Sequence, residues 1–184
     1  MTNPIQRLKN GVIVLCHADG DEPFNFPNYI AAFARAAEMG GAVGIRAQGF
    51  DNIKSVCSAV SLPVVGISRG NYADGWALIT PDVSDVENII KAGADIVALD
   101  VTQRVRPNGM DGFEFLELVR KRYNVPLVAD VSTYIEGVRA AEFKILAGFE
   151  LVPNPIRFQP AVTAERTQAG WCMIYTGDHI RLLR

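Results

Sequence analysis

Six short apolar runs alternate with longer amphipathic segments along this chain, and each run is rich in Val, Ile and Leu. The runs lack the regular polar alternation of strands with one exposed face. They therefore predict strands that are buried on both faces, as in a parallel sheet. The six runs cover residues 11–16, 42–47, 62–68, 95–100, 125–130 and 148–152.

The segments between these runs carry apolar residues at helical spacing and predict one helix after each of the first five strands. In residues 28–41 the spacing places Ile30, Phe33, Ala34 and Ala37 on one face, and two glycines end the helix. The other predicted helices cover residues 51–60, 80–93, 111–124 and 132–148.

Two of these helices carry recognisable signals at their ends. Asp51 is the predicted N-cap of one, and Thr80, which precedes a proline, is the predicted N-cap of the next. In the second helix Val83, Val86 and Ile90 form the apolar stripe, and a glycine closes it.

The alternation of strands and helices predicts an α/β fold, for which we prefer a (β/α)8 TIM-barrel type over an open, doubly wound sheet. Several helices end in Gly-Gly or Ala-Gly directly before a strand, and two strands begin with a proline that follows an apolar residue. No GxGxxG motif follows the first strand, which argues against a dinucleotide-binding sheet.

The pattern changes after Val152, where three prolines fall within eight residues and no amphipathic helix is recognisable. Residues 171–175, Trp-Cys-Met-Ile-Tyr, could form one more strand. We therefore divide the chain into a partial barrel domain, residues 1–152, and an atypical tail, residues 153–184. An incomplete barrel of about six units would keep open strand edges, so we expect a homo-oligomer or poor solubility.

The composition predicts one soluble, globular domain, with 49% hydrophobic and 21% charged residues among 184. A net charge of −2 gives no reason to expect nucleic acid or an anionic membrane as a partner. The apolar run near the N-terminus is too short for a signal peptide or a membrane span, so we expect a cytoplasmic protein.

The cysteines and histidines give little sign of metal or redox chemistry. Cys16, Cys57 and Cys172 lie far apart and form no CxxC motif, so we predict buried thiols in a reducing compartment. His17 and His179 are the only histidines, which excludes a histidine-rich metal site. We expect neither a metal nor a cofactor.

Polar side chains follow five of the predicted strands at the point where each strand ends. The C-terminal strand ends form the working face of a (β/α) barrel, so these side chains would meet at one end of an apolar ring. They predict a site for a small molecule, and the arginines favour a phosphate or carboxylate group. The residues are Cys16, His17, Arg46, Gln48, Ser68, Arg69, Asp100, Thr102, Asp130 and Ser132.

Several of these polar residues also have a purely structural interpretation. Asp100 and Asp130 could each cap a turn or pair with a nearby arginine. Arg104 and Arg106 lie on the loop that follows and could form a solvated charged segment. His17 could be a hydrogen-bonded loop histidine.

The hydroxyl groups of Ser132 and Thr133 need a separate interpretation. Neither histidine occupies a recognisable base position beside them, so we do not predict a nucleophile here. One of the two is expected to be the N-cap of the helix that follows.

At these residues the chain resembles the bacterial N-acetylmannosamine-6-phosphate 2-epimerases, TIM-barrel enzymes of sialic acid catabolism. Matching segments lie in the same order over about residues 8–152, and "IRAQG", "ALDVTQRVRPNG" and "ADVST" are specific in combination. The resemblance implies reversible epimerisation at C2 of an N-acetylated hexosamine 6-phosphate, without a redox cofactor. Such a reaction needs a base, an acid and dipoles that stabilise the developing negative charge.

The resemblance also implies roles for single residues. Arg46 matches the substrate-binding arginine of the family, and Asp130 matches its active-site aspartate. Asp100, Arg104 and Arg106 match a shared Asp-x-Thr-x-Arg-x-Arg-Pro segment.

Two positions depart from the family pattern. His17 stands where the family usually has glutamine, and Arg69 stands where it has a catalytic lysine. An arginine keeps its proton at any ordinary pH and is a poor base, although it can orient a substrate or stabilise an enolate. The expected catalytic residues are Arg69 and Asp130, and the expected substrate-binding residues are His17, Arg46, Gln48, Asp100 and Arg104.

The residues after Val152 do not match the family, whose later strands carry a catalytic glutamate and a glycine-rich phosphate loop. One explanation is a frameshift, which translation of the downstream DNA in the other frames would test. The alternative function is a truncated or degenerate barrel that at most binds a sugar phosphate. A third hypothesis keeps the isomerase class but changes the substrate, with His17 as the base.

Overall fold

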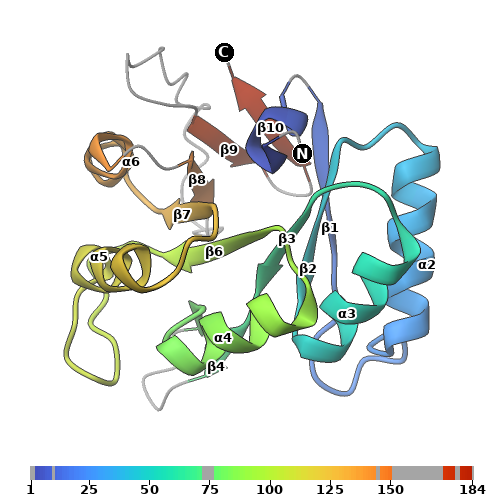
Figure 1. Cartoon of the computed structure of the whole chain (residues 1–184), viewed down its shortest axis with the longest axis horizontal. Helices are drawn as coiled ribbons and strands as arrows, with labels where there is room; N and C mark the ends of the chain where they lie inside the picture. The colour runs from blue at the N-terminus through green and yellow to red at the C-terminus, as the bar shows by residue number, and fades with distance from the viewer. Residues whose placement is uncertain are drawn as a thin grey trace, which may run out of the picture.

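The computed structural model describes residues 3–9, 11–71, 77–143, 146–150, 172–176 and 179–183 (Figure 1). Its strands are β1 (Val12–Cys16), β2 (Gly44–Gln48), β3 (Val64–Ile67), β4 (Arg69–Asn71), β5 (Ala77–Ile79), β6 (Ile96–Asp100), β7 (Leu127–Val131), β8 (Leu146–Glu150), β9 (Cys172–Thr176) and β10 (His179–Leu183). Its helices are α1 (Pro4–Arg7), α2 (Pro27–Met39), α3 (Phe50–Ala59), α4 (Val83–Ala92), α5 (Gly112–Arg122) and α6 (Tyr134–Glu142). All six predicted strands are confirmed with small shifts at their ends, and β9 is the suggested further strand.

The strands close into a barrel in the order β1-β10-β9-β8-β7-β6-β3-β2, which confirms the TIM-barrel type. The pairs from β1 through β2, β3, β6, β7 and β8 to β9 are parallel. β10 runs antiparallel between β9 and β1. The expectation of an open edge at the first strand is therefore wrong, because β10 pairs with β1. The division of the chain at residue 152 and the oligomeric state stay predictions.

Residues of the parallel strands alternate between two apolar clusters, which explains why the strands lack polar alternation. The outer cluster lies between the strands and the helices, and includes Ile45, Ala47, Val97, Leu99 and Ala129. The inner cluster contains no residue of α2 to α6 and fills the barrel; it includes Ile13, Val65, Ile67, Ile96, Ala98 and Val128. In Figure 1, α2, α3 and α4 follow one another along one side of the sheet, with α5 and α6 beyond them.

Two helices begin at caps that differ from the prediction. α3 begins after Gly49, whose φ of 83° turns the chain out of β2, and Asp51 lies in the first turn instead of at the cap. α4 begins after Asp82, whose carboxylate accepts two backbone N–H groups in a reciprocal capping box. Thr80 instead has a φ of 50°, and its hydroxyl oxygen accepts the backbone N–H of Ser68 at 3.3 Å.

The buried face of α2 also differs from the prediction. Phe33 is 44% exposed, and Ala31 is buried in its place beside Ile30 and Ala34. The Phe33 ring instead contacts Phe24 edge-on, with 5.9 Å between the ring centroids. The apolar residues of this helix therefore cover two adjacent faces. The face that carries the small alanines packs on the sheet, and the face that carries Phe33 does not.

Three local features were not predicted. The predicted helix over residues 132–148 ends as α6 at Glu142, and its last residues belong to β8. α1 precedes the first strand, and an antiparallel hairpin of β4 and β5 interrupts the path from β3 to α4. The hairpin begins at Arg69, which pairs with Ile79, so it fixes the backbone of a predicted site residue.

Gly112, the first residue of α5, is predicted to tolerate no side chain. A Cβ at this position would lie 2.6 Å from the Thr102 carbonyl oxygen and 2.6 Å from Val101 Cα, both of which are backbone atoms. Gly112→Ala should therefore lower the free energy of unfolding by about 1–3 kcal/mol, measured by urea denaturation. Gly40→Ala is the control, because its Cβ would lie 3.4 Å from its nearest neighbours; its change should stay within about 0.5 kcal/mol. Equal losses in both variants would contradict this close approach of α5 to the backbone that follows β6.

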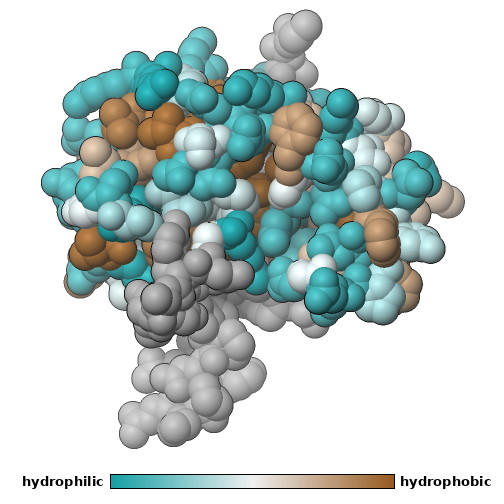
Figure 2. Space-filling model, turned by 90° about the horizontal axis from the view of Figure 1, so that it is seen from below, coloured by the Kyte–Doolittle hydropathy of each residue, from teal (hydrophilic) through white to brown (hydrophobic). Residues whose placement is uncertain are grey.

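Hydrophilic and hydrophobic side chains are interspersed on the face of the molecule seen from below in Figure 2. The apolar side chains on this face form separate patches between charged and polar ones. Among the described residues, no helix has both the length and the apolar character needed to cross a membrane.

Candidate active site

Polar residues continue the inner rows of the strands at their C-terminal ends. Asp100 and Asp130 each lie two residues after an inner-cluster residue, and they are paired in register on β6 and β7. Arg46 lies between two outer-cluster residues of β2, so its side chain is on the inner face. His17 lies four residues after Ile13 of β1, and Arg69 lies two residues after Ile67 of β3. Both even spacings continue the inner rows of these strands. The alternation therefore brings together the residues that the sequence marked as separate strand ends.

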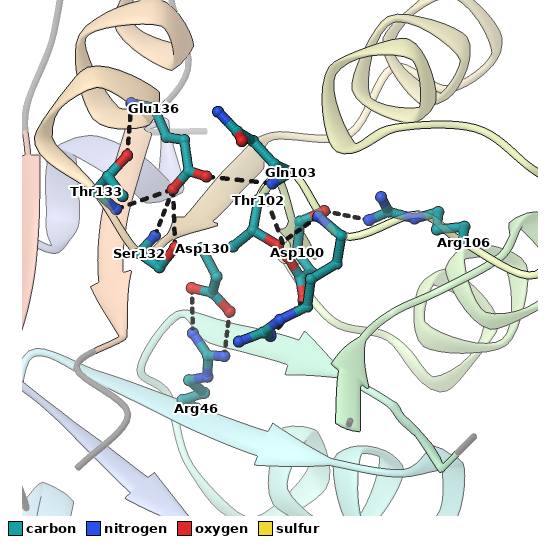
Figure 3. Close-up of polar contacts among 10 residues, drawn as sticks. Arg46, Asp100, Thr102, Gln103, Arg106, Asp130, Ser132, Thr133 and Glu136 are labelled. Atoms are coloured by element: carbon teal, nitrogen blue, oxygen red, sulfur yellow. Dashed lines mark hydrogen bonds and ion pairs between the residues drawn. The ribbon is translucent and has the colours of Figure 1, made fainter. Parts of the chain in front are cut away.

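Arg46 and Asp130 form a buried, bidentate ion pair inside the barrel (Figure 3). Arg46 Nη1 donates to Asp130 Oδ1 at 2.9 Å, and Nη2 donates to Oδ2. Only 7% of Arg46 and 4% of Asp130 is exposed. β3 and β6 separate β2 from β7 in the barrel, so the ion pair links two strands that are not neighbours.

Asp100 organises the loop that follows β6. Its Oδ1 accepts the backbone N–H of Thr102 at 3.0 Å, and its Oδ2 lies 3.4 Å from Arg104 Nη1. The Arg106 guanidinium donates to the Asp100 carbonyl oxygen and lies over the Phe115 ring, 4.5 Å from its centroid. The alternative of a solvated segment is wrong for Arg106, which is 2% exposed. Arg104, with 28% of its side chain exposed, is the arginine of this loop that can reach a ligand.

Asp19 lies at the centre of a second polar group and was missed in the sequence. One carboxylate oxygen lies 3.5 Å from Gln48 Nε2, and the other lies 3.3 Å from Arg69 Nη1. The same second oxygen lies 3.7 Å from His17 Nε2. The loop after β1 therefore gathers predicted residues from three strands around one carboxylate. The available signal was its position, two residues after the predicted site residue His17.

Burial lowers the pKa of His17 from its ordinary value of 6.5. The Asp19 carboxylate opposes this by raising the pKa, Arg69 and Arg46 add to the lowering, and Glu22 raises it. The surroundings of the imidazole therefore favour its neutral form. Gln48, which contacts Asp19, lies two residues after Arg46 on β2 and therefore on the same face of the strand. The group around Asp19 thus adjoins the buried Arg46 ion pair, and the two form one site.

Cys16 on β1 and Cys57 on α3 both have environments that favour the protonated thiol. Burial raises the pKa of Cys16 to about 11, and Cys16 is buried as predicted. The pKa of Cys57 is raised to about 11 by burial and by the nearby Asp95, although this side chain is only partly buried. Neither thiol supplies a nucleophile at neutral pH. Cys172 lies on β9, and its side chain is outside the described residues.

Glu136 joins the loop after β6 to the loop after β7, and it too was missed. Its Oε2 accepts the backbone N–H groups of Ser132 at 2.8 Å and Thr133 at 2.9 Å, and its Oε1 accepts that of Gln103 at 3.2 Å (Figure 3). The side chain of Thr133 caps α6, which confirms the N-cap interpretation. The spacing of Thr133 and Glu136 is a capping-box signature, but the added contact with Gln103 is visible only in the structure.

Glu136→Ala is predicted to lower the free energy of unfolding by about 2 kcal/mol or more, because it leaves three backbone donors without their acceptor. Urea denaturation measures the loss. Glu114→Ala is the matched control: Glu114 has the same place in the capping box of α5 but is exposed. Its loss should be about 0.5–1 kcal/mol. Equal losses would show that the link between the two loops adds nothing to capping.

One predicted residue, Ser68, lies outside this site. Ser68 falls on the outer row of β3, and its backbone bonds to Thr80 at the base of the hairpin. Within the described part of the chain, no group of three or more His, Cys, Asp and Glu side chains is placed to hold a metal ion.

Comparison with known proteins gives the family. The family described as "Putative N-acetylmannosamine-6-phosphate epimerase" matches residues 30–156, which is more than half of the chain. This chain belongs to that family. The N-acetylmannosamine-6-phosphate epimerase family thus covers β2 to β8 and the Arg46–Asp130 pair.

Individual members of the epimerase family match over much of the chain. A "Putative N-acetylmannosamine-6-phosphate 2-epimerase" of Caldanaerobacter subterraneus subsp. tengcongensis is 42% identical over 153 residues, 83% of this chain and 63% of that protein. A relative of the same name from Synechococcus elongatus is 35% identical over 173 residues, 94% of this chain and 73% of that protein. The solved N-acetylmannosamine-6-phosphate 2-epimerase from Clostridium perfringens is 33% identical, with a TM-score of 0.71, and the match covers 78% of this chain and 63% of that one. The chain therefore spans less than two thirds of the length of the first of these relatives.

Proposed function

We propose that this chain interconverts N-acetylmannosamine 6-phosphate and N-acetylglucosamine 6-phosphate by epimerisation at C2. The observation that carries the proposal is the inner site in which the Arg46–Asp130 pair adjoins the polar group around Asp19, through Gln48 on the same strand as Arg46. This site lies at the end of the barrel where such enzymes bind their substrates. Family membership supports the sugar phosphate as substrate. The reaction would serve sialic acid degradation in the cytoplasm.

The guanidinium groups of this site suit an anionic sugar. Arg46 is held rigidly by its buried pair, whereas Arg69 and Arg104 keep 29% and 28% of their side chains exposed. Gln48 Oε1 is buried and has no hydrogen-bond partner among the described residues, so a sugar hydroxyl or amide N–H could donate to it. His17, Arg46, Gln48, Asp100 and Arg104 are the proposed substrate-binding residues.

The chemical step places negative charge on the substrate. Removal of the C2 proton from the open-chain sugar moves an electron pair onto the C1 carbonyl oxygen, and a fixed positive charge lowers the energy of this enolate. Arg69 is the proposed stabilising group, and Asp130 is the proposed group that keeps Arg46 in place at the reacting end.

The test is exchange at C2 in deuterated water. Purified protein incubated with N-acetylmannosamine 6-phosphate should incorporate deuterium at C2 and form the C2 epimer, both followed by proton NMR. Mannose 6-phosphate, which lacks the acetamido group, is the control for substrate specificity. If neither exchange nor the C2 epimer is detected, the proposal is refuted. Binding of the sugar phosphate without exchange would favour the non-catalytic barrel.

A further inference from the structure

A C2 epimerase needs a group that accepts a proton from carbon, and most carboxylates of this site are already engaged. Both oxygens of Asp130 accept from Arg46. In Asp100, one oxygen accepts from Thr102 and the other lies beside Arg104. The oxygens of both carboxylates are therefore already occupied by contacts within the protein.

The other described groups at the strand ends are also poorly suited to take the proton. Arginine guanidinium groups stay protonated at ordinary pH. The Cys16 thiol, with its pKa raised to about 11 by burial, stays protonated as well. Both oxygens of Glu136 accept backbone N–H groups, and those of Asp19 face Gln48 and Arg69. Among the strand-end side chains that the structure describes, which do not include that of Glu150 on β8, this leaves His17.

The surroundings of His17 suit a base. Its side chain is 22% exposed, so a ligand in the mouth can reach it. Asp19 Oδ2 lies 3.7 Å from Nε2 and can balance an imidazolium, while Arg69, which contacts the same oxygen, keeps a positive charge close by. With Arg46 and Glu22 these are the charged groups that act on the ring, and burial is the largest influence on its pKa, which it lowers.

We propose that His17 removes the C2 proton of the sugar phosphate, an inference that rests on the proposed function. The C2–H bond breaks, the proton moves to a ring nitrogen of neutral His17, and the electron pair moves onto the C1 carbonyl oxygen as an enolate. Solvent water then donates a proton to the opposite face of C2, and the hydroxide so formed takes the proton from the imidazolium. No oxidant or reductant is needed, and His17 is neutral again.

The partners of His17 divide the electrostatic work. The imidazolium that forms is stabilised by Asp19, while the Arg69 guanidinium faces the developing enolate. Arg69 thus supplies charge in this chain, and His17 moves the proton.

The experiment compares C2 exchange by the whole chain and by His17→Gln. The variant should exchange at least about 10²-fold more slowly, with a larger change in kcat than in KM, because a general base contributes to kcat. In the unaltered protein kcat/KM should fall on the acid side with an apparent pKa below 6.5, since only the neutral ring can accept a proton. This acid limb should vanish in His17→Gln and remain in a variant of the other histidine, His179→Gln.

Two further measurements keep the outcomes distinct. Imidazole added to His17→Ala should restore part of the exchange, and the His17 ring should titrate by NMR at the pKa of the acid limb. An unaltered protein that shows no exchange refutes the proposed function itself. Exchange by His17→Gln at the unaltered rate, or a ring titration that does not match the acid limb, overturns only the role of His17.

Discussion

Arg46→Met is expected to lower the free energy of unfolding by about 3–5 kcal/mol and to abolish C2 exchange. The cause is the Asp130 carboxylate, which would stay buried inside the barrel without its ion-pair partner. Urea denaturation measures the loss of stability, and NMR in deuterated water measures exchange.

A double-mutant cycle separates the pair from its surroundings. Arg46→Met combined with Asp130→Leu should be more stable than Arg46→Met alone, because no buried charge is left uncompensated. The surface control is Lys121→Met. Lys121 pairs with Glu117, and 77% of the Lys121 side chain and 51% of the Glu117 side chain are exposed. This variant should lose less than about 0.5 kcal/mol of unfolding free energy. Additive losses in the cycle would show that the two side chains do not interact as the structure places them.

Arg69→Met is expected to lower kcat by about 10²–10³-fold, the usual effect of removing one donor that stabilises an oxyanion. Its stability should change little, because Arg69 and its partner Asp19 are both partly exposed. Arg69→Lys keeps the positive charge and should retain more activity than Arg69→Met. Steady-state kinetics with N-acetylmannosamine 6-phosphate gives the comparison.

The control for Arg69 is a surface arginine with a similar ion pair. Arg122→Met removes a guanidinium that lies 3.0 Å from Glu87, with 55% of its side chain exposed. This variant should keep the unaltered kcat. If Arg69→Met also keeps it, the enolate is stabilised by another group and the proposed role of Arg69 is wrong.

The parallel strands were predictable from sequence because burial on both faces leaves an unbroken apolar run. β6 shows this most clearly, since all of Ile96–Asp100 is buried. Helix starts were harder to predict, because Thr80 and Asp82 are both good caps two residues apart. The carboxylate that could form a reciprocal capping box became the cap.

Barrel closure could not be predicted from the local pattern. Residues 179–183 carry an ordinary apolar and polar mixture, and their role as β10 depends on the edges that β9 and β1 offer. Strand pairing of this kind joins residues far apart in sequence, and no periodicity within the segment reveals its partner.

The site was predictable where a polar residue ends an apolar run, as at Arg46, Asp100 and Asp130. Asp19 and Glu136 lie beyond the strand ends, in a loop and a helix, where polar residues are ordinary. Their importance comes from neighbours in space that belong to other β/α units. The sequence pattern shows which strand positions face inward, but not which loop and helix residues join one β/α unit to another.

The antiparallel direction of β10 has a practical consequence for immobilising or labelling the protein. β10 heads back toward the end of the barrel where the parallel strands begin, and its Arg181 pairs with Val12, the first residue of β1. A fluorescent protein or affinity tag fused beyond β10 would therefore emerge on the side opposite to His17 and Arg69. Attachment to a surface through such a tag would leave the mouth of the barrel open to substrate.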